Sequence, residues 1–421
     1  MPLFVMAVVA LAPFLKSQYL EAQVSSPEQW VGCWALEHLE EWAPSVAEAG
    51  FPTGHAAPAP RMVLLDRLPG RAGLMGRDGP PSFRAEWEDP ALRNLDAWAL
   101  RSDDHVYLEA SPGVRSVVLL LEGPPEPSIP GRWFFRRSDT PFPEVRAMVV
   151  ADRVACPEGR GPHREESRPE LGQVFQSQGA EGTFVLYDTA GRRLVRVEEA
   201  RARERFLPGE SFAIPAALLA LQHQVVSLDE TFPWDGVVYA REDWNRDHDL
   251  RSAFHQAVPW VLEEVASRVP GAAWGRELGR YGNRQFTGGT TGFWVDGDLR
   301  ISADEKVAWL ADVVRDRSVP PGRRGDGSRI DPVEALAYLL GREDRRDREG
   351  SRIHGLSGWA RGSGPAVGWK VGWVEGDGEL HLFALNLTSP QKLEIDPDLP
   401  RRLALEILEV LGILPGETEG R

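Results

Sequence analysis

Cysteine and lysine are scarce in this 421-residue chain, which has two cysteines and four lysines against 44 arginines. Two cysteines are too few for a clustered thiolate zinc site, and neither His-Glu-x-x-His nor a Gly-Lys-Ser/Thr phosphate loop occurs. We therefore expect no metal and no cofactor. The formal net charge of -15 would repel phosphate groups, which argues against nucleic acid and anionic membranes as partners.

The two cysteines, Cys33 and Cys156, stand at either end of one segment of distinct composition. A disulfide between them would close a loop of more than 100 residues, and the chain-entropy model gives such a loop roughly 4 to 5 kcal/mol of stabilisation. Disulfides of this kind form in oxidising compartments. The alternative is a pair of buried free thiols.

The chain has no apolar run long enough to cross a bilayer. The apolar run within its first 15 residues has the length of the hydrophobic region of a signal peptide. We therefore expect residues 1–22 to be a signal peptide, and the mature protein to be periplasmic or extracellular without a transmembrane span. No basic region precedes the run, so a misassigned start or an ordinary core element is the alternative.

Length and composition predict two domains, because 421 residues with 42% hydrophobic content exceed what one core usually supports. Residues 30–156 contain short β-type runs separated by Gly, Pro and Asp, which predicts a sandwich or barrel. Residues 157–172 are charged and almost without apolar side chains, which is typical of a linker. Residues 173–416 have strands at both ends and helical spacing between them, which predicts an α+β domain with an antiparallel sheet flanked by helices.

The first of these domains carries a short motif at its start, Gly32-Cys33-Trp34. It resembles the Gly-x-Trp opening of lipocalin-like β-barrels, and the resemblance implies that Trp34 lies under the barrel floor. The alternative is a tryptophan in an ordinary β core. A lipocalin-like carrier, with the second domain of minor importance, is one hypothesis for the whole protein.

The second domain carries many motifs in a fixed order, including Trp-Asp-Gly at 234–236 and Tyr-Gly-Asn at 281–283. Over residues 173–414 they resemble the class D serine β-lactamases, members of the penicillin-binding transpeptidase superfamily. The other matching stretches are 182–188, 201–208, 212–215, 244–254, 293–294, 299–304, 367–369, 371–375 and 383–386.

The resemblance implies an acyl-transfer site whose reactive positions have been replaced. In the family, a serine at the start of a helix attacks the lactam carbonyl, and a lysine three residues later is the base. Here Glu210 stands at the serine position and Ala213 at the lysine position. Gln256 replaces the serine of the second motif, and Leu356 replaces the lysine of the third. We therefore expect no catalytic residue at these four positions.

The walls of the implied groove match the family better than its reactive positions do. The residues expected to line it are Ser211, Val258, Tyr281, Gly282, Asn283, Trp294, Ser357, Gly358 and Arg402. Of these, Arg402 could supply a guanidinium for a ligand carboxylate. Ser211 lies one residue past the nucleophile position, about 100° around the helix. No lysine stands behind it, so its activation would rest on Glu210.

Two further hypotheses remain for the second domain. The first is an inactive, exported penicillin-binding-like protein. Its groove would hold a β-lactam-like or peptidoglycan-peptide-like ligand without covalent chemistry, or its surface would dock another envelope protein. The second is an active serine β-lactamase, or an acyl-enzyme β-lactam sensor, that works with displaced residues. Four simultaneous replacements favour the first hypothesis. Catalytic groups that act as a unit give no turnover once the nucleophile is lost.

Overall fold

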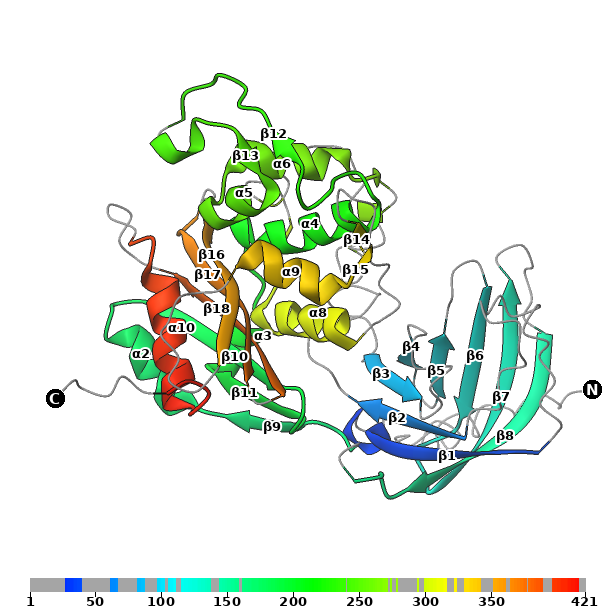
Figure 1. The fold of residues 1–421 in the computed structure, drawn as a ribbon. Helices are drawn as coiled ribbons and strands as arrows, with labels where there is room; N and C mark the ends of the chain where they lie inside the picture. The colour runs from blue at the N-terminus through cyan, green and yellow to red at the C-terminus, as the bar shows by residue number, and fades with distance from the viewer. Residues whose placement is uncertain are drawn as a thin grey trace, which may run out of the picture.

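A computed structural model gives the arrangement of the chain, in which two bodies are joined by the segment after Val154 (Figure 1). The structure describes residues 27–39, 61–66, 82–87, 97–102, 105–110, 115–137, 144–158, 161–239, 241–271, 273–274, 278, 294, 299–315, 322–323, 329–341, 351–360, 364–376, 378–388 and 396–415. Among these residues, no helix combines the length and the apolar character needed to cross a membrane.

The amino-terminal body is a closed eight-stranded antiparallel barrel, which decides between the sandwich and the barrel. Each strand pairs with the next in sequence, and β1 pairs with β8 to close the ring. Closure leaves no exposed sheet edge. The strands are β1 (Gly32–His38), β2 (Met62–Asp66), β3 (Ser82–Trp87), β4 (Ala97–Ser102), β5 (His105–Ala110), β6 (Arg115–Glu122), β7 (Ser128–Arg137) and β8 (Glu144–Val154).

A tryptophan pair lies at one end of this barrel. The short helix η1 (Pro27–Trp30) precedes β1, and Trp34 Nε1 donates to the Trp30 carbonyl at 3.0 Å. Both rings are fully buried. The Arg153 guanidinium lies 5.5 Å from the centre of the Trp34 ring and donates to the Val31 carbonyl at 2.7 Å. Trp34 therefore packs between η1 and the barrel core.

The predicted disulfide is present and ties the start of the barrel to the segment that leaves it. Cys33 on β1 and Cys156 just after β8 are bonded. In the β1–β8 pairing, Cys33 lies opposite Val154, so the bond fastens the seam at which the barrel closes.

The segment expected to be a linker is partly folded. It contains β9 (Arg164–Ser167), which pairs in parallel with β11, and the short helix η2 (Pro169–Leu171). Hydrophobic patterning could not reveal this strand, because β9 has no apolar side chains. Cross-strand ion pairs hold it instead: Glu165 contacts Arg196 at 2.7 Å, and Glu166 contacts Arg193 at 3.4 Å.

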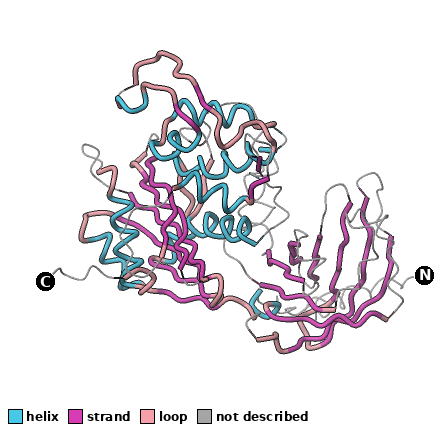
Figure 2. The backbone as a smooth tube through the Cα atoms, in the orientation of Figure 1, coloured by secondary structure: helices cyan, strands magenta, loops and turns pink. Residues whose placement is uncertain are grey.

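The second body is an α+β domain built on a six-stranded sheet, as predicted (Figure 2). The strand order is β16-β17-β18-β10-β11-β9, in which β10 near the domain start pairs with β18 near its end. The new strands are β10 (Glu181–Asp188), β11 (Arg193–Val197), β16 (Arg352–Ala360), β17 (Val367–Gly376) and β18 (Glu379–Thr388). Two small ribbons pair β12 (Thr231–Phe232) with β13 (His248–Asp249), and β14 (Gly322–Arg323) with β15 (Arg329–Ile330).

Helices cover both faces of this sheet (Figure 1). One face packs against η3 (Gly209–Phe212) and α8 (Ala303–Arg315), and the same apolar core includes α4 (Ala213–Gln222) and α6 (Pro259–Arg268). The other face packs against α2 (Gly172–Gln176) and α10 (Leu399–Val410). The remaining helical segments are α3 (Glu199–Arg203), η4 (Glu242–Trp244), α5 (Leu250–Gln256) and α9 (Pro332–Leu340). In α4 every residue from Ala213 to Leu221 is buried, as expected of a helix that is apolar on all sides.

Candidate functional site

The first family motif lies where η3 and α4 meet the edge strand β16. At this point the backbone of η3 comes very close to the sheet. A Cβ atom on Gly209, whose φ is +51°, would lie 2.6 Å from Ala360 Cα. Both the left-handed backbone and the close contact therefore require glycine at this position.

Glu210 fills the space between the helix start and the strand. Its Oε2 accepts a hydrogen bond from the Trp359 backbone N–H at 3.2 Å. A Cβ atom on Gly358 would lie 2.6 Å from Glu210 Cβ and 2.7 Å from Oε2. A backbone N–H that faces a helix start can act as an oxyanion-hole donor in acyl transfer. Here a carboxylate of the protein itself takes that donor.

Ala213, at the position of the family lysine, is 3% exposed and belongs to the main apolar core. A methyl group carries no exchangeable proton. The helix that holds the first motif therefore offers no base at this position.

A lysine contacts Ser211, which corrects the expectation that no lysine stands behind this serine. The Lys306 Nζ atom donates to Ser211 Oγ at 2.8 Å, and Ser211 Oγ donates to the Pro208 carbonyl at 2.6 Å. The amine also lies 4.6 Å from the centre of the Trp369 ring. This lysine comes from α8, 95 residues further along the chain, so a search for a lysine near Ser211 in sequence could not find it.

The amine of Lys306 is shielded from water, because the side chain is buried and lies against the Trp369 ring. Burial lowers the pKa of Lys306 to about 7, against the opposing effect of Glu305. A buried lysine with a lowered pKa can act as a proton acceptor near neutral pH.

The second motif contacts η4. In the amide orientation that satisfies its contacts, the Gln256 side chain donates to the Asp243 carbonyl at 3.1 Å and accepts from Arg246 Nη2 at 3.0 Å. Trp244 Nε1 donates to the Gln256 carbonyl at 2.9 Å. Gln256 therefore ties the end of α5 to η4. Val258 is fully buried at the start of α6.

The third motif lies on β16, and its two side-chain positions face opposite sides of the sheet. Leu356 is buried in the core shared with α4. Ser357, the next residue, lies opposite Lys370 of β17 in the strand register, on the face that α10 covers. Lys370 is 1% exposed. The Leu356 position has no cation, but a buried amine stands across the strand pair from Ser357.

The remaining groove residues differ in where they lie. Trp294 is buried, its carbonyl accepts from Gly209 N at 2.9 Å, and its ring stacks on Phe212 at 5.8 Å. Arg402 lies on α10, which packs on the sheet face opposite α4, and it pairs with Asp396 at 2.5 Å. The structure therefore brings Trp294 to the first motif and does not bring Arg402 there. Tyr281, Gly282 and Asn283 lie outside the described residues.

Comparisons with known proteins cover the second body. Residues 182–407 match the model of the penicillin-binding protein transpeptidase domain. Beta-lactamase OXA-10 of Pseudomonas aeruginosa is 30% identical over 250 residues, which are 58% of this chain and 88% of that protein. Beta-lactamase OXA-48 of Klebsiella pneumoniae is 30% identical over 245 residues, 57% of this chain and 87% of its own.

A third relative and a solved structure extend this likeness. Beta-lactamase OXA-20 of Pseudomonas aeruginosa is 31% identical over 278 residues, 64% of this chain and 97% of its own length. The crystal structure of the class D beta-lactamase YbXI from Nostoc has a TM-score of 0.50 at 24% identity, and the alignment covers 58% of this chain and 99% of that one. The solved structure supports the fold alone.

Proposed function

Because the chain belongs to the penicillin-binding transpeptidase family, with a class D β-lactamase-like second domain, we propose that this domain is catalytically inactive and binds a ligand or partner without covalent chemistry. The observation that carries the proposal is the place of Glu210. Its carboxylate stands where the family has its nucleophile and accepts the Trp359 N–H bond at 3.2 Å.

The residues at 210 and 213 bear on two requirements of acyl transfer. In the family, acyl transfer needs a serine hydroxyl close to a base, and a carboxylate at position 210 with a methyl group at 213 supplies neither. Acyl transfer also needs donors for the developing oxyanion. The Trp359 N–H already has a negatively charged partner, so a ligand carbonyl would have to displace Glu210 to reach it.

We further propose that the protein acts outside the cytoplasm. The Cys33–Cys156 disulfide supports an oxidising compartment, and the apolar first 15 residues support export. The ligand of the groove would be β-lactam-like or peptidoglycan-peptide-like, or the partner would be another envelope protein. An amide N–H or an ammonium group on that ligand could pair with Glu210.

Calorimetric titration with benzylpenicillin, combined with intact-mass measurement, tests this function. The unmodified protein should bind reversibly or not at all and show no mass increase. The Glu210→Ser/Ala213→Lys variant should gain a penicilloyl adduct if the groove walls are intact. Glu204→Ser, on an exposed residue outside the groove, is the matched control and should gain none. Nitrocefin hydrolysis by the unmodified protein would contradict the proposal.

A second candidate function, an active hydrolase or acyl-enzyme sensor with displaced residues, is favoured by the Ser211–Lys306 contact of 2.8 Å. The lowered pKa of Lys306 fits a general base. Two observations favour a structural role instead: Ser211 is 1% exposed and Lys306 5% exposed, and the Ser211 hydroxyl donates to Pro208.

Point variants separate this candidate from the first. If Ser211 were a nucleophile, any nitrocefin turnover would disappear in Ser211→Ala and in Lys306→Met, and would persist in Ser177→Ala, which changes an exposed serine on another element. We expect no turnover in any of the four proteins.

A further inference from the structure

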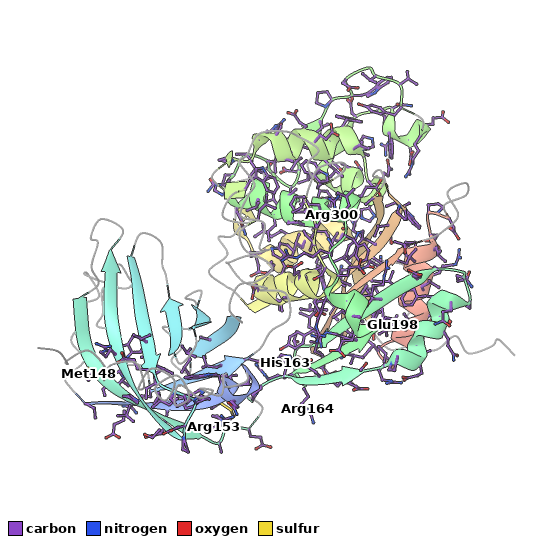
Figure 3. All side chains as sticks on the ribbon, turned by 180° about the vertical axis from the view of Figure 1, so that it is seen from behind. Met148, Arg153, His163, Arg164, Glu198 and Arg300 are labelled. Atoms are coloured by element: carbon purple, nitrogen blue, oxygen red, sulfur yellow. A yellow bond between two sulfur atoms is a disulfide. The ribbon has the colours of Figure 1, made fainter. Side chains whose placement is uncertain are left out.

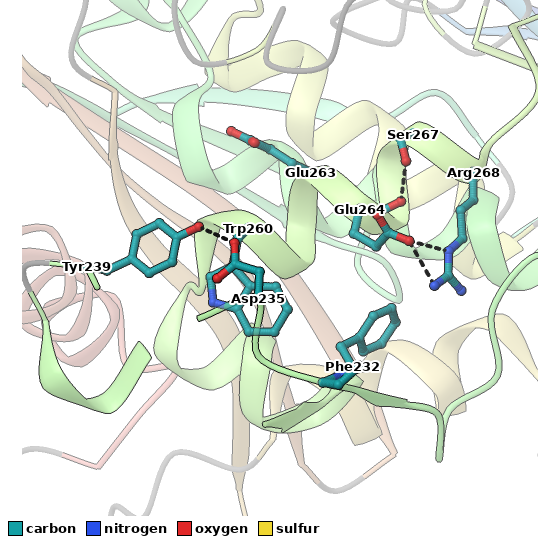
Figure 4. A pocket seen from close by; sticks show the side chains of 9 residues that line it. Phe232, Asp235, Tyr239, Trp260, Glu263, Glu264, Ser267 and Arg268 are labelled. Atoms are coloured by element: carbon teal, nitrogen blue, oxygen red, sulfur yellow. Dashed lines mark hydrogen bonds and ion pairs between the residues drawn. The ribbon is translucent and has the colours of Figure 1, made fainter. Parts of the chain in front are cut away.

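A cleft lies between the loop that follows β12 and the outer face of α6 (Figure 4). It has a volume of about 510 Å³. Three aromatic rings, three carboxylates and one guanidinium line it. None of the groove residues discussed above contributes to it, so an inference about this cleft does not rest on the function proposed for the groove.

One side of the cleft already holds a guanidinium, from Arg268. This side chain pairs with Glu264 at 2.9 Å and also with Glu230. Its guanidinium carbon lies 5.2 Å from the centre of the Phe232 ring. Carboxylates and an aromatic face together are the usual surroundings of a bound guanidinium. One of the two negative charges on this side is therefore balanced within the protein.

The other side is acidic and aromatic as well. Tyr239 donates its hydroxyl to Asp235 Oδ2 at 3.1 Å, while the Val237 backbone N–H fixes Asp235 Oδ1 at 2.9 Å. The Trp260 ring lies beside Asp235 (Figure 4) and is held by a bond from its Nε1 to the Trp244 carbonyl at 3.1 Å. Glu263 on α6 also lines the cleft.

The negative charge of Asp235 and Glu263 acts on Tyr239. Burial, the hydrogen bond to Asp235 and the charges of Asp235 and Glu263 all raise the pKa of Tyr239. Aromatic and acidic groups are thus placed together on this side, as they are around Arg268. Between Asp235 and Tyr239 in the chain stand two exposed apolar side chains, Val237 at 53% and Val238 at 79% exposure.

We propose that the Asp235–Tyr239–Trp260–Glu263 side of the cleft binds an arginine side chain of a partner polypeptide. The planar guanidinium can stack on Trp260 while it donates to the carboxylates, an arrangement that a lysine ammonium cannot match. Apolar residues next to that arginine would cover Val237 and Val238, since exposed apolar groups of this kind often mark interaction sites.

The test uses the full chain and two tripeptide amides, acetyl-Val-Arg-Val and acetyl-Val-citrulline-Val, in calorimetric titrations at low salt. Citrulline has the shape of arginine without its charge. The arginine peptide should bind at least tenfold more tightly than the citrulline peptide, and the difference should shrink in 0.5 M salt because screening weakens charge pairing.

Two variants localise the binding. Glu263→Lys changes an exposed residue of α6 and leaves the Asp235 contacts with Val237 and Tyr239 in place. This variant should bind the arginine peptide at least tenfold more weakly. Asp235→Asn combined with Glu263→Gln should do the same. Glu406→Gln combined with Glu181→Gln removes the same charge from exposed positions elsewhere and should have no such effect. Equal binding of both peptides, or an equal loss in the distant pair, would overturn the proposal.

Discussion

The sequence resemblance places Glu210 at the nucleophile position of the family, and in the structure this side chain is packed against the neighbouring strand. The side chain lies against Gly358 and accepts from Trp359. A carboxylate near a helix start is also favoured by the helix dipole. The site around Glu210 is therefore a satisfied structural arrangement, and reversing it would require more than one change.

At the residue scale, the buried amine of Lys306 predicts that the stability of the fold depends on pH. Its pKa is lowered from 10.5 to about 7 by burial, so between pH 7 and 10.5 the unfolded chain binds a proton that the folded chain has lost. Stability from this group therefore rises with pH across that window. Relative to Lys306→Met, the unmodified protein should gain on the order of 3 kcal/mol in the free energy of unfolding between pH 7 and 10.

Urea unfolding at a series of pH values measures this difference. Ser211→Ala keeps the amine and should show the same dependence on pH as the unmodified protein. If Lys306→Met and the unmodified protein change in parallel across the window, the amine is not titrating as a buried group.

At the residue scale, replacements within one motif can be predicted from the sequence, whereas contacts between residues far apart in the chain cannot. The replacements at Glu210 and Ala213 are visible in one short stretch. The Ser211–Lys306 contact joins residues 95 positions apart, and Lys370 faces Ser357 only through the β16–β17 register. Neither pair can be found without knowing which strands and helices are neighbours.

At the scale of elements, the approach of η3 to β16 leaves no room for added atoms. Gly358→Ala would place a Cβ atom 2.6 Å from Glu210 Cβ, so η3 or the strand must shift. We expect a loss of about 1 to 3 kcal/mol in the free energy of unfolding. Combining Gly358→Ala with Glu210→Gly should recover part of the loss, since the contacting side chain is gone.

Thermal unfolding of the single and double variants checks this. Gly364→Ala is the matched control, because a Cβ atom there would meet nothing within 4 Å. Equal effects of Gly358→Ala and Gly364→Ala would mean that the helix start and the edge strand do not pack as described.

Sequence patterns predicted some elements of the fold and missed others. Most of the barrel strands, the sheet made of first and last strands, and the central helices follow from periodicity and punctuation, but β1 and β4 do not. The strand β9 does not, because ion pairs with Arg193 and Arg196 hold it in place of apolar contacts. Charged composition was therefore a misleading sign of a linker in that segment.

At the scale of the whole molecule, a cluster of charges joins the barrel to the second domain. Asp66, at the end of β2, is fully buried and contacts His163 Nδ1 at 2.7 Å and Arg192 Nη2 at 2.7 Å. His163 also lies 3.3 Å from Glu165. Figure 3 shows His163 and Arg164 where the two bodies meet. These contacts couple the position of one domain to that of the other.

The charge cluster at the junction predicts that stability falls as the pH rises, which is opposite to the effect of Lys306. Burial alone would lower the pKa of His163, but hydrogen bonds to Asp66 and Glu165 raise it to about 9. Its contribution to stability is thus complete below about pH 6.5 and is lost as the pH rises through 9. His163→Gln should cost about 2 to 3 kcal/mol at pH 6 and almost nothing at pH 10.

Unfolding experiments at both pH values test the junction, with His223→Gln as a control on an exposed histidine. A cost for His163→Gln that does not change between pH 6 and 10 would show that the charged form of His163 does not hold the junction.

The disulfide stabilises the barrel as a whole. Its 123-residue separation gives a stabilisation of about 4 to 5 kcal/mol in the chain-entropy model. Cys33→Ser combined with Cys156→Ser should therefore lower the melting temperature of the barrel far more than that of the second domain. Proteolysis during heating can follow the two domains separately, and simultaneous loss of both would show that they unfold as one unit.

Whether the protein forms a covalent bond with a penicillin tests the central claim most directly. The unmodified chain should be incubated overnight with a fluorescent penicillin, denatured, and weighed intact by mass spectrometry. The account predicts the mass of the unmodified chain and no fluorescent band. A stoichiometric adduct, mapped by peptide sequencing to Ser211 or any other side chain of the second domain, would contradict it.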